Sequence, residues 1–286
     1  MTKLAAWQAD LLLLGVAATW GATFITVKNA LGGISPFVFI TIRFTLAFLF
    51  LLLIYRPGKG LLRRGNLRAG GIIGLFLFGG YAFQTVGLQY TSAANAGFIT
   101  GLSVVLVPLL SIFVSKKYPN LYVLGGALAA SLGLGLMTLD EHLSFHPGDL
   151  LVLLCAVSFA LHIITIGIFA PRQDTTILTV TQIGFVALLS LMLTFFLPQE
   201  TWQITWRKDL WIALGLTAIP ATSLAILIQN RVQQYTSPAR TAIIFATEPV
   251  FGAFFAWYFG GEILTGQALW GAALVLTGML LAELKE

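Results

Sequence analysis

Long apolar runs recur along the whole chain, and they limit the possible folds more than any other feature of the sequence. Several of them approach the roughly 20 residues that an α-helix needs to cross about 30 Å of hydrocarbon at 1.5 Å per residue. Charged residues make up 9% of the chain, whereas about 25% is usual in a soluble domain. Water cannot solvate most of such a surface. The sequence therefore predicts an all-α integral membrane protein without a separate soluble domain.

The apolar runs predict ten transmembrane helices joined by short connections. These spans lie at residues 10–31, 36–55, 69–89, 94–115, 122–139, 149–169, 176–197, 210–233, 239–259 and 265–282. The connections at 56–68 and 198–209 are the longest. No connection is long enough to hold a catalytic domain, so the chemistry is expected within the spans.

The positive charges of the loops predict the orientation in the membrane. With the amino terminus inside, twelve Lys and Arg residues fall on the inner side and three on the outer side, while Arg43 lies within a span. Cytoplasmic loops carry the excess of Lys and Arg, so both termini are predicted in the cytoplasm. The net charge of +5 is spread over these loops without forming a stripe, and no nucleic-acid partner is expected.

The second half of the chain repeats the first. The block at 89–94 (QYTSAA) recurs 145 residues later at 234–239 (QYTSPA). Nearer the start of each half the offset is 139 residues, which aligns Trp20 with Phe159. The chain therefore divides into two predicted repeats, 1–146 and 147–286.

Each predicted repeat holds five spans, and this odd number has a topological consequence. The two copies must cross the membrane in opposite directions, as a five-plus-five inverted repeat. Inverted repeats recur in secondary transporters, because two near-equivalent halves can expose one central site alternately to each side of the membrane. The sequence thus favours a transporter whose partners are the lipid bilayer and a small-molecule substrate.

Two titratable residues lie near the middle of predicted spans. Glu248 is roughly 13 Å deep by the helical rise, where an ionised group costs at least about 2.5–3.5 kcal/mol unless it has a partner or a water-filled path. We interpret it as a proton carrier or a contact for a cationic substrate group; the alternative is a protonated acid bonded to a neighbouring helix. His162 is the second proton-coupling candidate, or a hydrogen-bonded structural histidine. Protons are thus a candidate coupling ion.

Arg43 lies about 10 Å inside the second span by the same rise. Its long side chain is expected to extend outward to the membrane interface; the functional alternative is that it binds a substrate carboxylate. Together with Glu248 it suggests a zwitterionic substrate, unless the two side chains pair with each other.

The remaining substrate-binding candidates are polar or aromatic groups at membrane depth: Trp20, Tyr81, Gln84, Gln229 and Phe245. Buried amides must be paired, so the two glutamines face the protein interior, where they bind substrate or join helices. Trp20 is core packing or an aromatic cavity wall. Pro249 has no N–H to bond the carbonyl of Phe245, four residues earlier, and Pro108 and Pro220 likewise leave the carbonyl four residues before them without its helical donor. A freed carbonyl can accept from an ammonium group, or simply mark a kink.

No metal or cofactor is expected. The chain has a single cysteine, and its predicted spans contain one Glu and one His. A membrane-embedded transferase would need clustered carboxylates with a metal, or a Ser/His arrangement, so an enzyme is the disfavoured alternative. A nucleotide-sugar permease would need several cations in the spans for its phosphates; a sugar or nucleoside permease stays open as an alternative cargo class.

Several short motifs, taken in order, resemble the drug/metabolite transporter superfamily and its EamA-type branch. They are Trp20-Gly21, Arg43-Phe44, the Tyr-Thr-Ser blocks that open the fourth and ninth spans, Glu248-Pro249 and the segment 261–271. The resemblance covers essentially the whole chain. It implies ten helices around a central cavity, with the fifth and tenth at the periphery.

The resemblance also implies a function and a location. Similar proteins commonly export amino acids or related small metabolites across the bacterial inner (plasma) membrane. Two departures make the first repeat atypical. Lys117 stands where Glu262 is in the second copy, and Pro108 lies about a turn beyond the position that matches Pro249.

Overall fold

The computed structural model describes residues 5–116, 118–138, 146–260 and 265–283, and all regular structure within them is helical. The elements are α1 (Ala6–Gly21), α2 (Thr23–Ala30), α3 (Pro36–Tyr55), η1 (Gly58–Leu62), α4 (Arg64–Gly87), α5 (Ala93–Gly101), α6 (Ser103–Ser115), α7 (Leu121–Thr138), α8 (Pro147–Phe169), η2 (Ala170–Arg172), α9 (Thr175–Phe196), α10 (Lys208–Ala218), η3 (Ile219–Leu224), α11 (Ala225–Val232), α12 (Pro238–Phe245), α13 (Glu248–Gly260) and α14 (Gly266–Glu283). The predicted departure at Lys117 and Glu262 lies outside the described residues.

The helices have the length and composition of membrane spans. Within the described residues, seven helical stretches are long and apolar enough to cross a membrane, and Leu121–Met137 and Gly266–Ala282 form shorter apolar helices. The predicted connection at 56–68 is shorter than expected, because α4 already begins at Arg64. The chain is therefore a multi-pass helical membrane protein.

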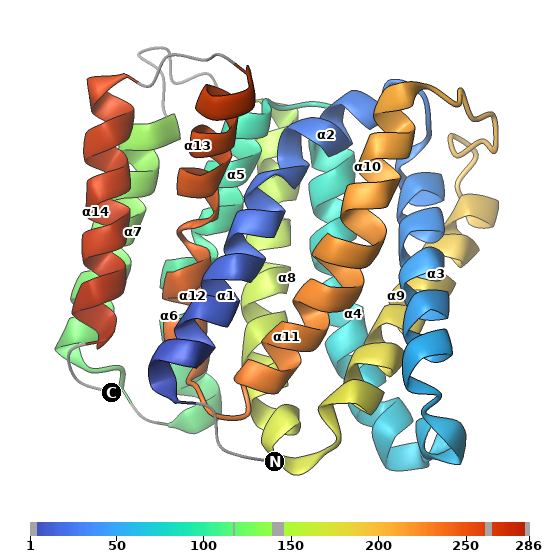
Figure 1. Ribbon diagram of the computed structural model, residues 1–286, viewed down its shortest axis with the longest axis horizontal. Coiled ribbons are helices and arrows are strands. Elements are labelled where there is room, and N and C mark those ends of the chain that lie inside the picture. The colour runs from blue at the N-terminus through green and yellow to red at the C-terminus, as the bar shows by residue number, and fades with distance from the viewer. Residues whose placement is uncertain (1–4, 117, 139–145, 261–264, 284–286) are drawn as a thin grey trace.

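The helix pair α7 and α14 forms one end of the molecule, and α3 and α9 lie toward the other end (Figure 1). The pair packs backbone against backbone through glycines. A Cβ atom placed on Gly126 would lie 2.5 Å from the Gly278 carbonyl oxygen, and one on Gly133 would lie 2.5 Å from that of Gly271. Small residues permit such close contact where lipid provides no hydrophobic drive for helix association.

The connection between α9 and α10 is bonded to the chain around the start of α3. The Glu200 carboxylate accepts from the backbone N–H groups of Phe37 (3.0 Å) and Val38 (3.3 Å) in the first turn of α3. The Thr205 N–H donates to the Gly33 carbonyl at 2.9 Å. Burial in this packed connection raises the pKa of Glu200 above its usual value, against the lowering effect of the two backbone bonds. The connection lies on the side opposite to the start of α1 and the end of α14 (Figure 1).

Three of the predicted spans are interrupted near the middle. The breaks fall at Ala22 between α1 and α2, at Leu102 between α5 and α6, and at 246–247 between α12 and α13. Pro249 accounts for the third break, because it lacks the N–H that would bond the Phe245 carbonyl. Pro108 causes no such break. It lies inside α6, which continues through it, while the break in this span falls six residues earlier.

Candidate functional site

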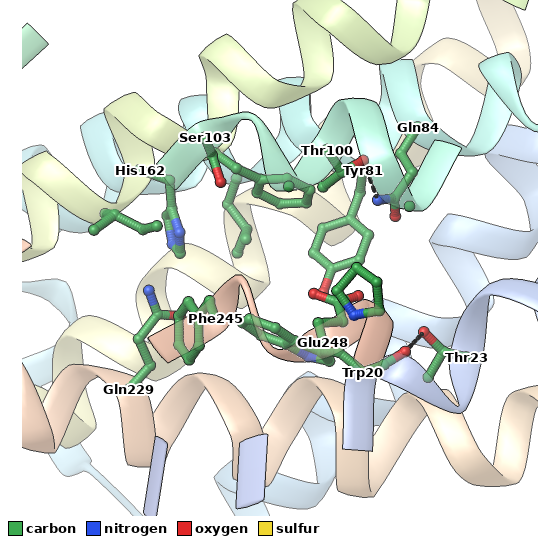
Figure 2. Close-up of a pocket in the computed structure, with 16 residues that line it drawn as sticks. Trp20, Thr23, Tyr81, Gln84, Thr100, Ser103, His162, Gln229, Phe245 and Glu248 are labelled. Atoms are coloured by element: carbon green, nitrogen blue, oxygen red, sulfur yellow. Dashed lines mark hydrogen bonds between the residues drawn. The ribbon is translucent and has the colours of Figure 1, made fainter. Parts of the chain in front are cut away.

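The three helix breaks lie around one cavity. Its walls combine aromatic, amide and hydroxyl side chains with one carboxylate (Figure 2). The lining residues are Trp20, Thr23, Leu77, Tyr81, Gln84, Gly97, Thr100, Gly101, Ser103, Phe159, His162, Ile163, Gln229, Phe245, Glu248 and Pro249.

Seven of the eight candidates named from the sequence line this cavity: Trp20, Tyr81, Gln84, His162, Gln229, Phe245 and Glu248. They come from six helices, with Tyr81 and Gln84 both on α4, and one physical reason explains why all seven face the cavity. A polar or amphipathic side chain in an apolar helix is turned away from lipid, so such side chains converge where helices enclose a space.

Arg43 is the exception, and it does not extend outward as expected. The side chain is 4% exposed. Its Nε donates to Thr222 Oγ1 at 2.8 Å, its Nη2 donates to the Tyr81 hydroxyl at 3.3 Å, and its guanidinium lies 4.5 Å from the Tyr81 ring centre. Within the described residues no carboxylate forms an ion pair with it. Arg43 thus lies one layer behind the cavity wall, where these contacts replace the water that an outward position would provide.

A π-helical turn at Ile219–Leu224 holds both Arg43 and Trp20 in place. Pro220 lies near its start, and the wider turn leaves backbone groups available to other side chains. The Ala221 carbonyl accepts from Trp20 Nε1 at 2.8 Å, while Thr222 receives the bond from Arg43. The indole is thereby oriented edge-to-face toward Phe245, with ring centres 4.8 Å apart.

His162 forms part of the wall and makes one well-defined hydrogen bond. Its Nε2 lies 2.8 Å from Gln182 Oε1, so with the amide oxygen as acceptor Nε2 carries the proton. Gln182 is the residue that the repeat aligns with Arg43. The arrangement fits a structural histidine, and the proton-coupling role of His162 stays a prediction.

Glu248 is the first residue of α13, directly after the break. Its side chain is partly exposed, and in Figure 2 its carboxylate points into the space that the Tyr81 hydroxyl also faces. Within the described part of the chain no donor forms a hydrogen bond with this carboxylate. The N-terminus of α13 favours negative charge at this position.

The repeat identifies lining residues that sequence reasoning about single side chains missed. Each of five pairs of matching positions contributes both members to the wall: Trp20 with Phe159 and Thr23 with His162 at the offset of 139, and Gln84 with Gln229, Thr100 with Phe245 and Ser103 with Glu248 at 145. Taking the repeat partner of each candidate would have found Phe159, Thr23, Thr100 and Ser103.

Gly97 differs from the glycines that pack helices together. A Cβ atom on Gly97 would meet no other atom within 4 Å, because the residue borders the cavity. Gly70 and Gly74, by contrast, do pack against α9, where a Cβ would lie 2.5 Å from Thr181 and 2.8 Å from Phe185. The missing side chain of Gly97 contributes open volume to the site.

Apolar helices interrupted around a cavity with polar and aromatic lining residues define a multi-pass membrane protein with an internal cavity. Among the described residues no group of three or more His, Cys, Asp or Glu side chains could hold a metal ion. The sequence matches the EamA-like transporter family over residues 7–139 and again over 146–284. The chain therefore belongs to this family, a branch of the drug/metabolite transporter superfamily.

Individual relatives agree with this assignment. An uncharacterized transporter of Archaeoglobus fulgidus is 37% identical over 277 residues, covering 97% of this chain and 86% of that protein. The uncharacterized transporter YyaM of Bacillus subtilis is 29% identical, with 96% and 92% covered. One solved crystal structure, 21% identical in sequence, shares the fold with a TM-score of 0.79 over 96% of this chain and 97% of its own.

Proposed function

We propose that the protein is a secondary transporter that exports a small amphipathic metabolite across the inner (plasma) membrane by alternating access. The observation that carries this proposal is the cavity itself. It is lined by polar and aromatic side chains, and it lies where three interrupted helices meet. Broken helices at membrane depth are tolerated where they line a cavity, and they form the binding sites of many transporters.

The proposed architecture is ten spans in a five-plus-five inverted repeat, with repeats 1–146 and 147–286. Three observations support it. The family match falls into two segments, one in each half. The breaks at Leu102 and at 246–247 are at matching positions, and five pairs of matching residues line the cavity. The charge bias of the loops supports cytoplasmic termini.

The nature of the cargo needs revision relative to the sequence-based hypothesis. A zwitterionic amino acid was suggested by one acidic and one basic group, but Arg43 does not line the cavity. The proposal therefore keeps an amphipathic metabolite and no longer requires a carboxylate. Protons are the proposed coupling ion, with Glu248 and His162 as the candidate carriers.

The proposal is tested by filling the cavity without disturbing the fold. Gly97→Leu places a side chain in the open space beside Gly97, so we expect solute counterflow in proteoliposomes to fall at least about tenfold from steric exclusion. Gly125→Leu is the matched control, because a Cβ at Gly125 also meets nothing within 4 Å, yet this residue lies on α7 away from the cavity. The screen should include amines, amino acids, sugars and nucleosides, so that it also covers the alternative cargo classes.

The result that contradicts the proposal is equally specific. If Gly97→Leu exchanges solute as fast as the wild-type protein, the cavity is not the transport path. If the folded wild-type protein exchanges no member of the screen, the transport function itself is rejected for these cargo classes.

A further inference from the structure

We infer that the cavity selects a cationic amine, a ligand whose positively charged nitrogen donates hydrogen bonds and whose body is aromatic or apolar. This inference rests on the proposed function, since it names the class of substrate for the same site. It depends on which hydrogen-bonding groups of the wall are already used within the protein. Hydroxyl groups can donate or accept. The groups that can only donate and those that can only accept therefore decide whether the cavity offers a ligand mainly donors or mainly acceptors.

Each wall residue with a side-chain nitrogen makes at least one hydrogen bond through a nitrogen within the protein. Trp20 Nε1 donates to the Ala221 carbonyl at 2.8 Å, Gln84 Nε2 donates to Thr100 Oγ1 at 3.3 Å, and His162 Nε2 is bonded to Gln182. Among the described residues no Lys or Arg lines the cavity. A ligand that needs donors, such as a carboxylate or a phosphate, would find few available in this wall.

Several hydrogen-bond acceptors of the wall, by contrast, have no donor within the described residues. The Glu248 carboxylate receives no hydrogen bond from the described residues. Gln229 is fully buried, and its Oε1 has no partner. The Phe245 carbonyl has lost its helical donor at Pro249. A buried acceptor without a donor costs about 1–3 kcal/mol, and a ligand N–H group would remove that cost.

The orientation of the Gln229 amide follows from its neighbours. Gln233 Nε2 donates to the Ile163 carbonyl at 3.0 Å, and a carbonyl can only accept. Gln233 therefore turns its Oε1 toward Gln229, whose Nε2 donates to it at 3.0 Å. The unpartnered atom of Gln229 must then be its oxygen, which is a buried acceptor in a residue of the cavity wall.

Four aromatic side chains complete the preference for a cation. Trp20 and Phe245 meet edge-to-face with ring centres 4.8 Å apart, and Tyr81 and Phe159 do so at 5.3 Å. All four line the same space as Glu248 (Figure 2). Aromatic faces attract cations, so this lining favours a ligand that carries a positive charge on an aromatic or apolar body. A zwitterion would bring its carboxylate into the same cavity as Glu248 without a cation to receive it.

A series of ligands that share one ring and differ only in their charged group tests the inference. Binding of 2-phenylethylammonium, phenylalanine, 3-phenylpropionate and 2-phenylethanol to the purified full-length protein is measured by titration calorimetry. We expect the ammonium compound to bind at least about tenfold more tightly than each of the others. In Glu248→Gln, this advantage over the neutral alcohol should disappear while binding of the alcohol is unchanged.

Arg43→Gln is the matched control, because it also replaces a buried charge with an amide and introduces the residue of the aligned position, Gln182. It should leave the order of affinities unchanged. The inference would be overturned if phenylalanine or 3-phenylpropionate bound the wild-type protein as tightly as 2-phenylethylammonium, or more tightly, and if Arg43→Gln abolished that binding. Failure of all four ligands to bind the wild-type protein overturns it as well. If a variant does not fold, the order of the four affinities for the wild-type protein decides the question.

Counterflow with the same four compounds separates this inference from the proposed function. If the ammonium compound binds through Glu248 but is not exchanged, the site assignment holds and the transport function fails. If a solute of another class is exchanged while the ammonium compound does not bind, the transport function holds and the cationic preference is wrong.

Discussion

The segments 93–115 and 238–260 are built alike. Each begins after a serine, Ser92 or Ser237, whose Oγ accepts from the backbone N–H three residues later, at 3.0 and 3.2 Å. Each continues as a short helix of nine or eight residues, breaks, and resumes as a helix of 13 residues. Both breaks border the cavity, so the two segments provide it with similar backbone geometry.

Their side chains differ at the positions that carry charge. Ser103 in the first segment corresponds to Glu248 in the second, and Asn95 corresponds to Arg240. The first segment also breaks without a proline, after Gly101, a residue type that weakens a helix interior. The comparison teaches that a helix can break at this position of the repeat without a Glu-Pro pair. The second segment adds the carboxylate in the cavity and a cation that is bonded to α1.

The largest effect is expected where α1 meets the break of the second segment. A Cβ atom on Gly21 would lie 2.5 Å from the Glu248 carbonyl oxygen and 2.8 Å from the Gly252 nitrogen. Backbone atoms cannot move aside cheaply, so Gly21→Ala should lower the free energy of unfolding by about 3 kcal/mol, as measured by denaturant unfolding in detergent. Gly15→Ala on the same helix is the control, because a Cβ there meets nothing within 4 Å. Equal stability of the two variants would contradict the close approach.

The second effect concerns the charge that distinguishes the segments. Glu248→Ser should weaken binding of 2-phenylethylammonium at least about tenfold, because the cavity loses its carboxylate. The double variant Ser103→Glu/Glu248→Ser moves the acid to the matching position of the first segment and should recover part of the affinity. Titration calorimetry measures both. A double variant no better than Glu248→Ser would show that the two positions do not serve one site.

The smallest effect is expected at the start of the second segment. Arg240 donates to Asp10 on α1 through Nε at 3.0 Å and Nη2 at 2.6 Å, and the two side chains are 14% and 13% exposed. Asp10→Asn keeps a hydrogen-bond acceptor but loses the charge, so it should cost about 0.5–1 kcal/mol of unfolding free energy. Asn95→Ala, at the position matching Arg240, should change it by less than about 0.5 kcal/mol. Thermal unfolding at low and high salt would check this, since only the effect of Asp10→Asn should shrink with salt.

Much of the candidate site could be predicted from the sequence, because a single residue and its own helix are enough to show that a polar side chain must face away from lipid. An apolar helix that contains a glutamine, a glutamate or a histidine must turn it away from lipid, and Gln84, Glu248 and His162 all reach the cavity. The repeat holds further information, since the partner of Trp20 is Phe159 and the partner of Glu248 is Ser103.

Other features depended on neighbours that the chain order does not reveal. Arg43 was expected at the interface, but Thr222 and Tyr81 supply its bonds in the interior. Gly97 borders open space, whereas Gly70 and Gly74 pack closely against α9. The helix α6 continues through Pro108, whereas the break at Leu102 between α5 and α6 involves no proline.

The sequence by itself determined that this is a helical membrane protein with a duplicated pattern and polar groups that must face inward, because hydrocarbon rejects them wherever the helices pack. Only the tertiary structure decided which of those groups share one space and which are already bonded. The distinction is physical. Burial of a polar group follows from its own chemistry, but whether its hydrogen bonds are used depends on atoms brought close by other helices. Thr222 and Tyr81 bond Arg43 in the interior, whereas no described residue donates a hydrogen bond to the Glu248 carboxylate or to Gln229 Oε1.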